Sequence, residues 1–350
     1  KKTIIKKYNK NSQIVYLYGS SYKDNISFKR FISQIYCAYE FYKFLKKKNE
    51  LPDVIISSYP TVELSWIACI YAKKYNIPFI LDVRDMWPDI ILKNLKLLQK
   101  IFFYPIYYLW KKMFIYMIKN TQKIFSITKE FLKWSLSVAN KKINPNKHRY
   151  FFLTKPESNL KILNKPNNEL KIKINKIKND INIIFCGSIS MRHNFKLILD
   201  AFVNTKNKKV NFIFCGHGKI YEIFKKNFNS YKNIFFLGWL NNNDLNFVLK
   251  NCDYGLIPYN GDDFDISYPN KLAEYLSNNL KIITCVNGIT KKLIKKKKIG
   301  YLYQENIYNS FLNVIENLKY NRSQKSYRLY KQMFDYKSII RNYIFSIKNV

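Results

Sequence analysis

The chain alternates short apolar runs with helix-length segments along its whole length, and this alternation limits the folds open to it. In the second half, runs rich in β-branched and aromatic residues occupy positions 183–186, 212–215, 234–237, 254–258 and 282–285. In the first half, comparable runs occupy positions 14–18, 54–57, 79–83 and 123–127. Strands that alternate with helices are typical of parallel sheets covered by helices on both faces. We therefore predict an α/β fold.

Length and composition indicate a folded protein of two domains. A chain of 350 residues suits two domains of ordinary size, and 47% hydrophobic residues exclude disorder. A segment rich in Lys, Asn and Pro with little periodicity interrupts the pattern. We predict a first domain at residues 1–152, a linker or domain edge at 153–181, a second domain at 182–322 and a C-terminal helical segment at 323–350.

One segment, residues 267–283 (SYPNKLAEYLSNNLKII), combines a helix start with groups suited to an anionic ligand. Pro269 suits the first helical turn, so Asn270 and Lys271 would lie at the positive end of the helix dipole, where a diphosphate is stabilised. Glu274 falls on the same helical face, three and four residues further on. The alternative interpretation is an ordinary helix with a solvated Lys–Glu pair.

Several motifs, in a fixed order, resemble a known enzyme family. They are DVIISSYP (53–60), LDVRDMWPD (81–89), IIFCGS (183–188), FIFCGHG (212–218), NIFFLGW (233–239), FVLKNCDYGLIPY (247–259) and PNKLAEYL (269–276). The set resembles the large group 1 (family four) class of retaining GT-B glycosyltransferases, in the branch that builds O-antigens and capsules. The resemblance covers most of residues 14–345. It implies two Rossmann-like domains that face a cleft, with the donor half second and a terminal helix returning to the first domain.

The resemblance also implies donor-binding residues in the second half. Loops at the carboxyl ends of parallel strands should hold the ligand. Gly187, Ser188 and Arg192 are diphosphate candidates, although the family often has Arg where this chain has Ser188, and Arg192 would otherwise be a solvated loop residue. Gly238 and Leu240 would meet the nucleotide base through main-chain groups, unless they form only an ordinary strand-to-helix turn.

Many family members carry two glutamates eight residues apart, the first near the sugar and the second near the ribose hydroxyls. Glu274 matches the second glutamate, whereas the first falls on Ile266. The neighbouring Asp265 would substitute for it, or this branch dispenses with the group. Each of these residues has a plain surface role as its alternative, and we weight Lys271 and Glu274 above Asp265.

Charged residues directly after a predicted strand mark the acceptor side. Arg84 and Asp85 follow the run at 79–83, which is an unfavourable place for charges unless they are paired or used. The resemblance places Arg84, Asp85 and Trp87 beside the acceptor and the transferred sugar. Asp85 would orient or deprotonate the acceptor hydroxyl. The alternative for Asp85 is a helix N-cap before Trp87 and the proline that follows it.

The charge balance favours an anionic partner. The formal charge is +38, from 61 basic and 23 acidic residues, and the lysines are scattered along a composition typical of AT-rich codon usage. No nucleic-acid-binding motif accompanies the charge, so an anionic membrane surface is the better partner and nucleic acid is not expected.

Residues 101–118 (IFFYPIYYLWKKMFIYMI) are the most apolar segment, but Pro105 and a Lys pair interrupt it. Two interpretations remain open for it, a packed helix of the first domain and a helix at the membrane interface.

Cysteine and histidine usage suggests no metal chemistry. The six cysteines stand singly, several within apolar runs, as reduced core residues of a cytoplasmic protein do. No paired-cysteine motif occurs, and the three histidines are far apart, so we expect neither a protein-bound metal nor a resident cofactor.

The resemblance implies transfer of a sugar from a nucleotide-diphosphate sugar, with UDP-sugars favoured, to a hydroxyl of a growing glycan. The acceptor would be linked to a polyprenyl diphosphate, and the enzyme would lie on the inner face of the bacterial cytoplasmic membrane. Alternatives are an inverting GT-B transferase, a sugar-nucleotide epimerase and, outside the enzymes, a polyanion-binding protein. In the family a strand, a glycine-rich loop and a helix open the first domain, and we expect that unit upstream of residue 1.

Overall fold

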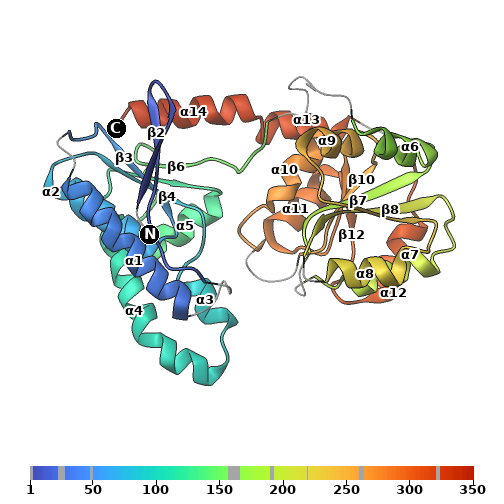
Figure 1. The fold of residues 1–350 in the computed structure, drawn as a ribbon, viewed down its shortest axis with the longest axis horizontal. Coiled ribbons are helices and arrows are strands. Elements are labelled where there is room, and N and C mark those ends of the chain that lie inside the picture. The colour runs from blue at the N-terminus through green and yellow to red at the C-terminus, as the bar shows by residue number, and fades with distance from the viewer. Residues whose placement is uncertain are drawn as a thin grey trace. The chain divides into compact units, whose positions relative to one another are not determined.

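The computed structural model describes residues 3–22, 28–47, 50–156, 166–189, 193–218, 220–259, 264–320 and 324–350. They form two compact units, Lys1–Phe151 with Ser346–Val350, and Phe152–Phe345. Each unit is built around its own parallel sheet, so the predicted α/β fold of two parallel-sheet domains is confirmed. Figure 1 labels the elements.

The sheet of the first unit has four parallel strands in sequential order. They are β3 (Ile55–Tyr59), β4 (Phe79–Val83), β5 (Lys123–Ser126) and β6 (His148–Tyr150). Its helices are α1 (Phe28–Lys46), α2 (Val62–Lys74), α3 (Asp89–Asn94), α4 (Leu97–Asn120) and α5 (Lys129–Ser137). Every residue of β4 is buried, as a strand covered on both faces requires. The core side of α4 presents Phe114, whose ring stacks on Tyr59 at a centroid distance of 4.5 Å.

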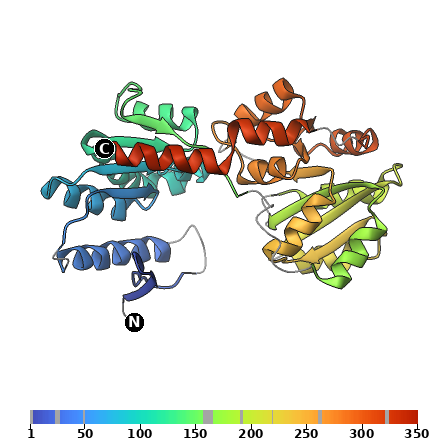
Figure 2. The ribbon, with the colours of Figure 1, turned by 90° about the horizontal axis from the view of Figure 1, so that it is seen from above.

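The expectation for residues 14–18 was wrong. They were predicted to form the first strand of the parallel sheet, whereas β2 (Ser12–Tyr16) pairs antiparallel with β1 (Ile4–Asn9) in a separate two-stranded ribbon. Asn11 N–H donates to Asn9 Oδ1 at 2.9 Å and closes the turn between the strands. Almost every residue of the ribbon is exposed, so its apolar side chains do not mark a core strand. The ribbon lies beside α1, where Thr3 Oγ1 donates to Glu40 at 3.2 Å (Figure 2).

The second unit has a six-stranded parallel sheet in the order β12-β11-β10-β7-β8-β9. The strands are β7 (Ile181–Ser188), β8 (Val210–His217), β9 (Ile234–Gly238), β10 (Tyr254–Ile257), β11 (Lys281–Thr284) and β12 (Gly300–Leu302). The helices are α6 (Asn168–Lys176), α7 (Phe195–Asn204), α8 (Tyr221–Phe228), α9 (Asn242–Lys250), α10 (Asn270–Ser277), α11 (Gly288–Lys297), α12 (Tyr308–Glu316), α13 (Lys325–Met333) and α14 (Tyr336–Lys348).

Alternating strand residues fill a core on each face of this sheet. Phe185 packs with α7, α8 and α12, whereas Cys186 packs on the opposite face with α6, α9 and α10.

The chain reverses its strand order between β7 and β10. In sheets of this kind a ligand binds beyond the carboxyl ends of the strands at such a switch point.

Two segments differ from the sequence-based expectation. Within the expected linker at 153–181 the structure has α6, because Leu170 and Ile174, four residues apart, are both buried in the core. The helical segment at 323–350 contains two helices. Asp335 separates them by capping α14, since its Oδ2 accepts a hydrogen bond from Ser338 N at 3.0 Å.

Candidate functional site

The carboxyl end of β7, which pairs with the end of β8, carries a glycine and an exposed serine. Gly187 has φ of +153°, a conformation that side-chain-bearing residues rarely adopt, and Ser188 beside it is exposed. A Cβ on Gly216 of β8 would lie 1.9 Å from the carbonyl oxygen of Gly187. The two strand ends therefore approach each other closely, and only glycine fits between them.

Lys271 reaches this strand end from α10. The helix begins at Asn270, with Pro269 as its N-cap residue and Lys271 in its first turn. A Cβ on Gly187 would lie 3.3 Å from Lys271 Cε and 3.9 Å from its Nζ. The structure thus brings together the glycine loop and the lysine that the sequence analysis named separately, at the switch point between β7 and β10.

Two ammonium groups neutralise the carboxylate of Glu274. Its Oε2 lies 2.9 Å from Lys271 Nζ and its Oε1 lies 2.5 Å from Lys155 Nζ. Glu274 is only 5% exposed, so the solvated Lys–Glu pair considered above does not describe this helix. Lys155 was missed because it comes from the segment expected to be a linker, and no sequence signal joins residues 119 positions apart.

Lys271 and Glu274 are both ionised, although Glu274 is buried. Burial on its own would raise the pKa of Glu274, but the charges of Lys271 and Lys155 outweigh it and the pKa is lowered. Burial opposes the charge on Lys271, yet the carboxylate of Glu274 helps to raise its pKa. Burial raises the pKa of the Cys186 thiol to about 11, so at neutral pH its S–H donates to Glu274 Oε2 at 3.6 Å. A half-buried lysine held ionised beside a strand end and the first turn of a helix is suited to a diphosphate.

The other donor-side candidates differ in exposure and in their contacts. Asn270 is exposed at the start of α10, and Leu240 is half-buried against the core. Gly238, at φ of +67°, ends β9. The carbonyl oxygen of Asp265 accepts a hydrogen bond from Ile289 N at 3.0 Å, which ties this residue to α11, while its side chain is exposed and Ile266 is half-buried. Arg192 lies outside the described residues.

Trp239 is a further exposed group at this edge of the sheet. Its side chain is 71% exposed, although large aromatic residues are usually covered. The ring of His217, at the end of β8, meets it edge-on at 5.1 Å. The pair therefore presents an aromatic surface on the same carboxyl edge as Gly187.

In the first unit, the acceptor-side candidates follow β4. Arg84 Nη2 pairs with Oδ2 of the buried Asp82 at 2.7 Å. Asp85 Oδ1 accepts from Met86 N at 2.6 Å within its own turn. The N-cap residue of α3 is Pro88, so the N-cap alternative for Asp85 does not hold in this structure.

Trp87 is connected through Trp110 to the carboxyl group of Glu63, which the sequence analysis did not identify. The Trp87 ring lies 5.3 Å from that of Trp110, whose Nε1 donates to Glu63 Oε1 at 2.7 Å. Glu63 is 8% exposed, and its Oε2 is buried without a hydrogen-bond partner. Burial raises its pKa. A single glutamate at the start of a predicted helix gives no sequence signal of this environment.

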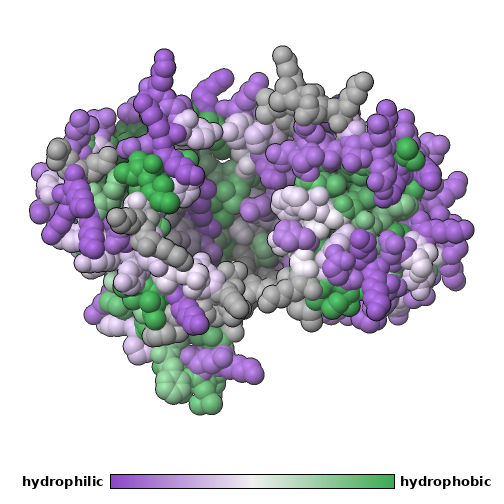
Figure 3. Space-filling model, in the orientation of Figure 1, coloured by the Kyte–Doolittle hydropathy of each residue, from purple (hydrophilic) through white to green (hydrophobic). Residues whose placement is uncertain are grey.

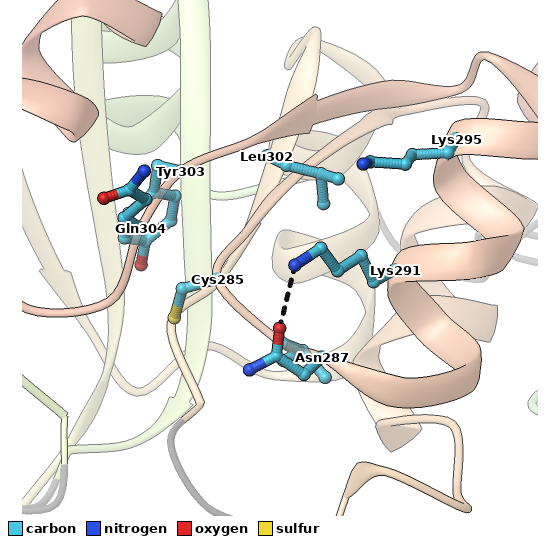
Figure 4. A pocket seen from close by; sticks show the side chains of 8 residues that line it. Cys285, Asn287, Lys291, Lys295, Leu302, Tyr303 and Gln304 are labelled. Atoms are coloured by element: carbon cyan, nitrogen blue, oxygen red, sulfur yellow. Dashed lines mark hydrogen bonds between the residues drawn. The ribbon is translucent and has the colours of Figure 1, made fainter.

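A separate pocket opens on the β11–β12 side of the second sheet (Figure 4). It has a volume of about 190 Å³, and Lys291 and Lys295 of α11 project toward it. Lys291 Nζ donates to Asn287 Oδ1 at 3.1 Å. The sequence analysis named none of these residues. Within the described part of the chain, no group of three or more His, Cys, Asp or Glu side chains is arranged to hold a metal.

Comparison with known proteins agrees with this geometry. Residues 166–333 match the family model described as Glycosyl transferases group 1. No curated protein sequence matches the chain.

Three solved structures illustrate the fold. Anabaena Alr3699/HepE in complex with UDP has a TM-score of 0.67 at 12% identity, over 89% of this chain and 82% of that one. Sucrose-phosphate synthase from Thermosynechococcus elongatus has a TM-score of 0.70 at 10% identity, over 98% and 86%. The lipopolysaccharide outer core galactosyltransferase WaaB, in its apo form, has a TM-score of 0.57 at 16% identity, over 92% and 82%.

These likenesses define the fold of the chain. The fold is that of the GT-B glycosyltransferases, as the sequence predicted. The match at residues 166–333 covers the sheet that carries Gly187, Lys271 and Glu274, and it supports a group 1 glycosyltransferase.

Proposed function

We propose that the protein transfers a sugar from a nucleotide-diphosphate sugar to a hydroxyl of a glycan. The observation that carries this proposal is the approach of Lys271 to Gly187 at the switch point of a sheet that matches group 1 glycosyltransferases. The backbone at Gly187 and Ser188, the first turn of α10 and the Lys271 ammonium would hold the diphosphate. UDP is the favoured nucleotide, since Anabaena Alr3699/HepE was solved with UDP and with UDP-glucose.

Charge neutralisation at the leaving group would do most of the catalytic work. As the bond to the sugar breaks, negative charge develops on the diphosphate, and the half-buried Lys271 ammonium and helix N–H groups would stabilise it. Each carboxylate oxygen of Glu274 contacts a lysine ammonium group. The remaining lone pairs would accept hydrogen bonds from the ribose hydroxyls. Asp85 would orient or deprotonate the acceptor hydroxyl, beside Arg84 and Trp87. We propose retention of anomeric configuration, which NMR of the product anomer tests.

The acceptor in this proposal is a lipid-linked glycan of a bacterial surface polysaccharide, such as an O-antigen or capsule, at the inner face of the cytoplasmic membrane. The support is the sequence resemblance, together with the similar fold of the lipopolysaccharide outer core galactosyltransferase WaaB. In the described residues, no helix is long and apolar enough to span a bilayer. We expect that transfer needs neither a protein-bound metal nor a resident cofactor.

The decisive experiment screens UDP-, GDP- and dTDP-sugars by thermal shift and follows with a transfer assay. Binding raises the melting temperature, and Lys271→Ala and Glu274→Ala should each lower affinity or rate about tenfold or more. Lys196→Ala, which removes an exposed lysine of α7, is the matched control and should change neither. Wild-type turnover by both site variants would remove the donor-site assignment.

The same experiment separates the alternatives. An inverting transferase gives the opposite anomer, and an epimerase changes the donor without an acceptor. A polyanion-binding protein would bind heparin with no response to any nucleotide sugar.

A further inference from the structure

The first turns of α4 are apolar on both sides of the helix. Tyr107 and Trp110 face the core of the first unit, whereas the opposite side exposes Leu97, Leu98, Ile101, Phe102, Tyr108 and Leu109. Leu98 is 72% exposed and Phe102 is 82% exposed. A helix that is apolar all round is ordinarily buried. Figure 3 shows the exposed side as a green patch at the end of the unit where Figure 1 draws this part of α4.

The exposed apolar residues form a stripe, which we call the α4 stripe and define as Leu97, Leu98, Ile101, Phe102, Tyr108 and Leu109. They recur three, four or seven positions apart, so they line one side of the helix. Monomeric proteins rarely leave such a contiguous surface uncovered without a partner. Among the described residues, no helix qualifies as a membrane span, so the stripe would lie along a surface rather than cross it.

Charge identifies the partner. Residues 90–129 contain no Asp or Glu but contain eight lysines. Lys96 and Lys112 are exposed at the two ends of the α4 stripe, and Lys112 lies over the ring of Tyr108 at 4.5 Å. Apolar and aromatic side chains between lysines match a bilayer interface, where rings sit at headgroup level and ammonium groups meet lipid phosphates.

We propose that the α4 stripe docks the protein on the surface of an anionic lipid bilayer. A second copy of the chain is the weaker occupant, because a two-fold contact through this stripe would bring lysines together without any acidic residue to pair them. Docking is independent of the sugar-transfer proposal, since the α4 stripe shares no residue with the donor-side or acceptor-side candidates.

The test is flotation of the full chain with phosphatidylcholine vesicles and with vesicles that also contain phosphatidylglycerol, at low and high salt. The wild type should float with the anionic vesicles and weaken in salt. Leu98→Ser/Phe102→Ser should lower its partition about tenfold or more, because two large side chains no longer enter the interface. Lys96→Gln/Lys112→Gln should weaken binding to anionic vesicles at low salt while leaving the salt-resistant part.

Matched controls lie on α8. Ile223→Ser replaces an apolar side chain that is 57% exposed, and Lys225→Gln/Lys226→Gln removes two charges, and neither should change flotation by as much. Each variant alters exposed side chains, so melting temperatures should match the wild type, and Phe102→Ser alone serves if the double variant does not fold. A wild type that stays soluble with anionic vesicles at low salt overturns the proposal. So does a concentration-dependent dimer that the double variant abolishes without any lipid binding.

Discussion

At the scale of single residues, the candidate donor site depends on one carboxylate shared by two lysines. Helix spacing predicted that Lys271 and Glu274 face each other, and their ion pair shows that they do. Sequence could not predict Lys155, because its contact with Glu274 depends on how two distant segments pack. Nor could it predict that Glu274 is buried and Lys271 half-buried, since a lysine and a glutamate at this spacing look like an ordinary surface pair. The burial makes the pair strongly coupled.

We therefore expect Lys271→Met and Glu274→Gln to be non-additive. Lys271→Met leaves the buried Glu274 carboxylate with Lys155 alone, and Glu274→Gln leaves the half-buried Lys271 ammonium without this carboxylate, whereas the double change removes both charges. The summed losses of the single variants in unfolding free energy should exceed the loss of the double variant by ~0.5–3 kcal/mol. Urea unfolding measures this, with the exposed Lys196–Asp200 pair on α7 as the control, whose coupling should not exceed about 0.5 kcal/mol. Equal coupling in the two pairs would contradict the buried role.

The buried carboxyl group of Glu63 should make the stability of the protein depend on pH. Its folded-state pKa is raised above 4.5 by burial, so the stability it contributes is complete below 4.5 and is lost as pH rises through the raised value. Glu63→Gln cannot ionise and keeps an oxygen for Trp110 Nε1. The melting temperature of the wild type relative to Glu63→Gln should therefore fall as pH rises from 4.5 toward neutral. A difference that stays constant across this range would show that Glu63 titrates normally.

At the scale of elements, sequence succeeds where apolar runs are long and fails where they are short or solvent-facing. The runs at 183–186 and 212–215 correspond to β7 and β8, whose residues alternate between two cores. β6 and β12 have only three residues each, too few for a period to appear. The β1–β2 ribbon has strand-like residues but no core, and α6 is so rich in Lys and Asn that its buried Leu170 and Ile174 are obscured.

The start of α14 gives a prediction at this scale. Asp335 caps the helix through Ser338 N and contacts Lys331, and hydrogen bonds from these two residues lower its pKa to about 2. Asp335→Ala should cost about 1 kcal/mol of unfolding free energy, whereas Asp335→Asn keeps the cap acceptor and should cost less. The carboxylate's contribution should be present above its ordinary value of 3.8 and lost as pH falls toward 2. Equal stability of the alanine variant and the wild type at neutral pH would remove this role.

At the scale of the whole molecule, charge is the dominant feature. The chain carries 61 basic and 23 acidic residues, so repulsion between cations outweighs attraction between opposite charges at long range. Such self-repulsion raises the free energy of a compact state relative to the expanded unfolded chain. The sign of this self-repulsion can be predicted from the sequence alone, because it depends on net charge and compactness and not on where each side chain lies.

Screening should therefore stabilise the protein. The Debye length falls to about 10 Å at 0.1 M salt, which weakens repulsion between exposed lysines while affecting the buried Lys271–Glu274 pair far less. The melting temperature should rise with sodium chloride, and choline chloride at equal ionic strength should reproduce the rise. The same salt series should weaken heparin binding steeply and UDP binding only slightly, because UDP would engage few cations in a built site whereas heparin engages many scattered ones. A melting temperature that falls with salt would contradict the repulsion argument, and equally steep loss of both ligands would favour the polyanion-binding alternative over a nucleotide-sugar site.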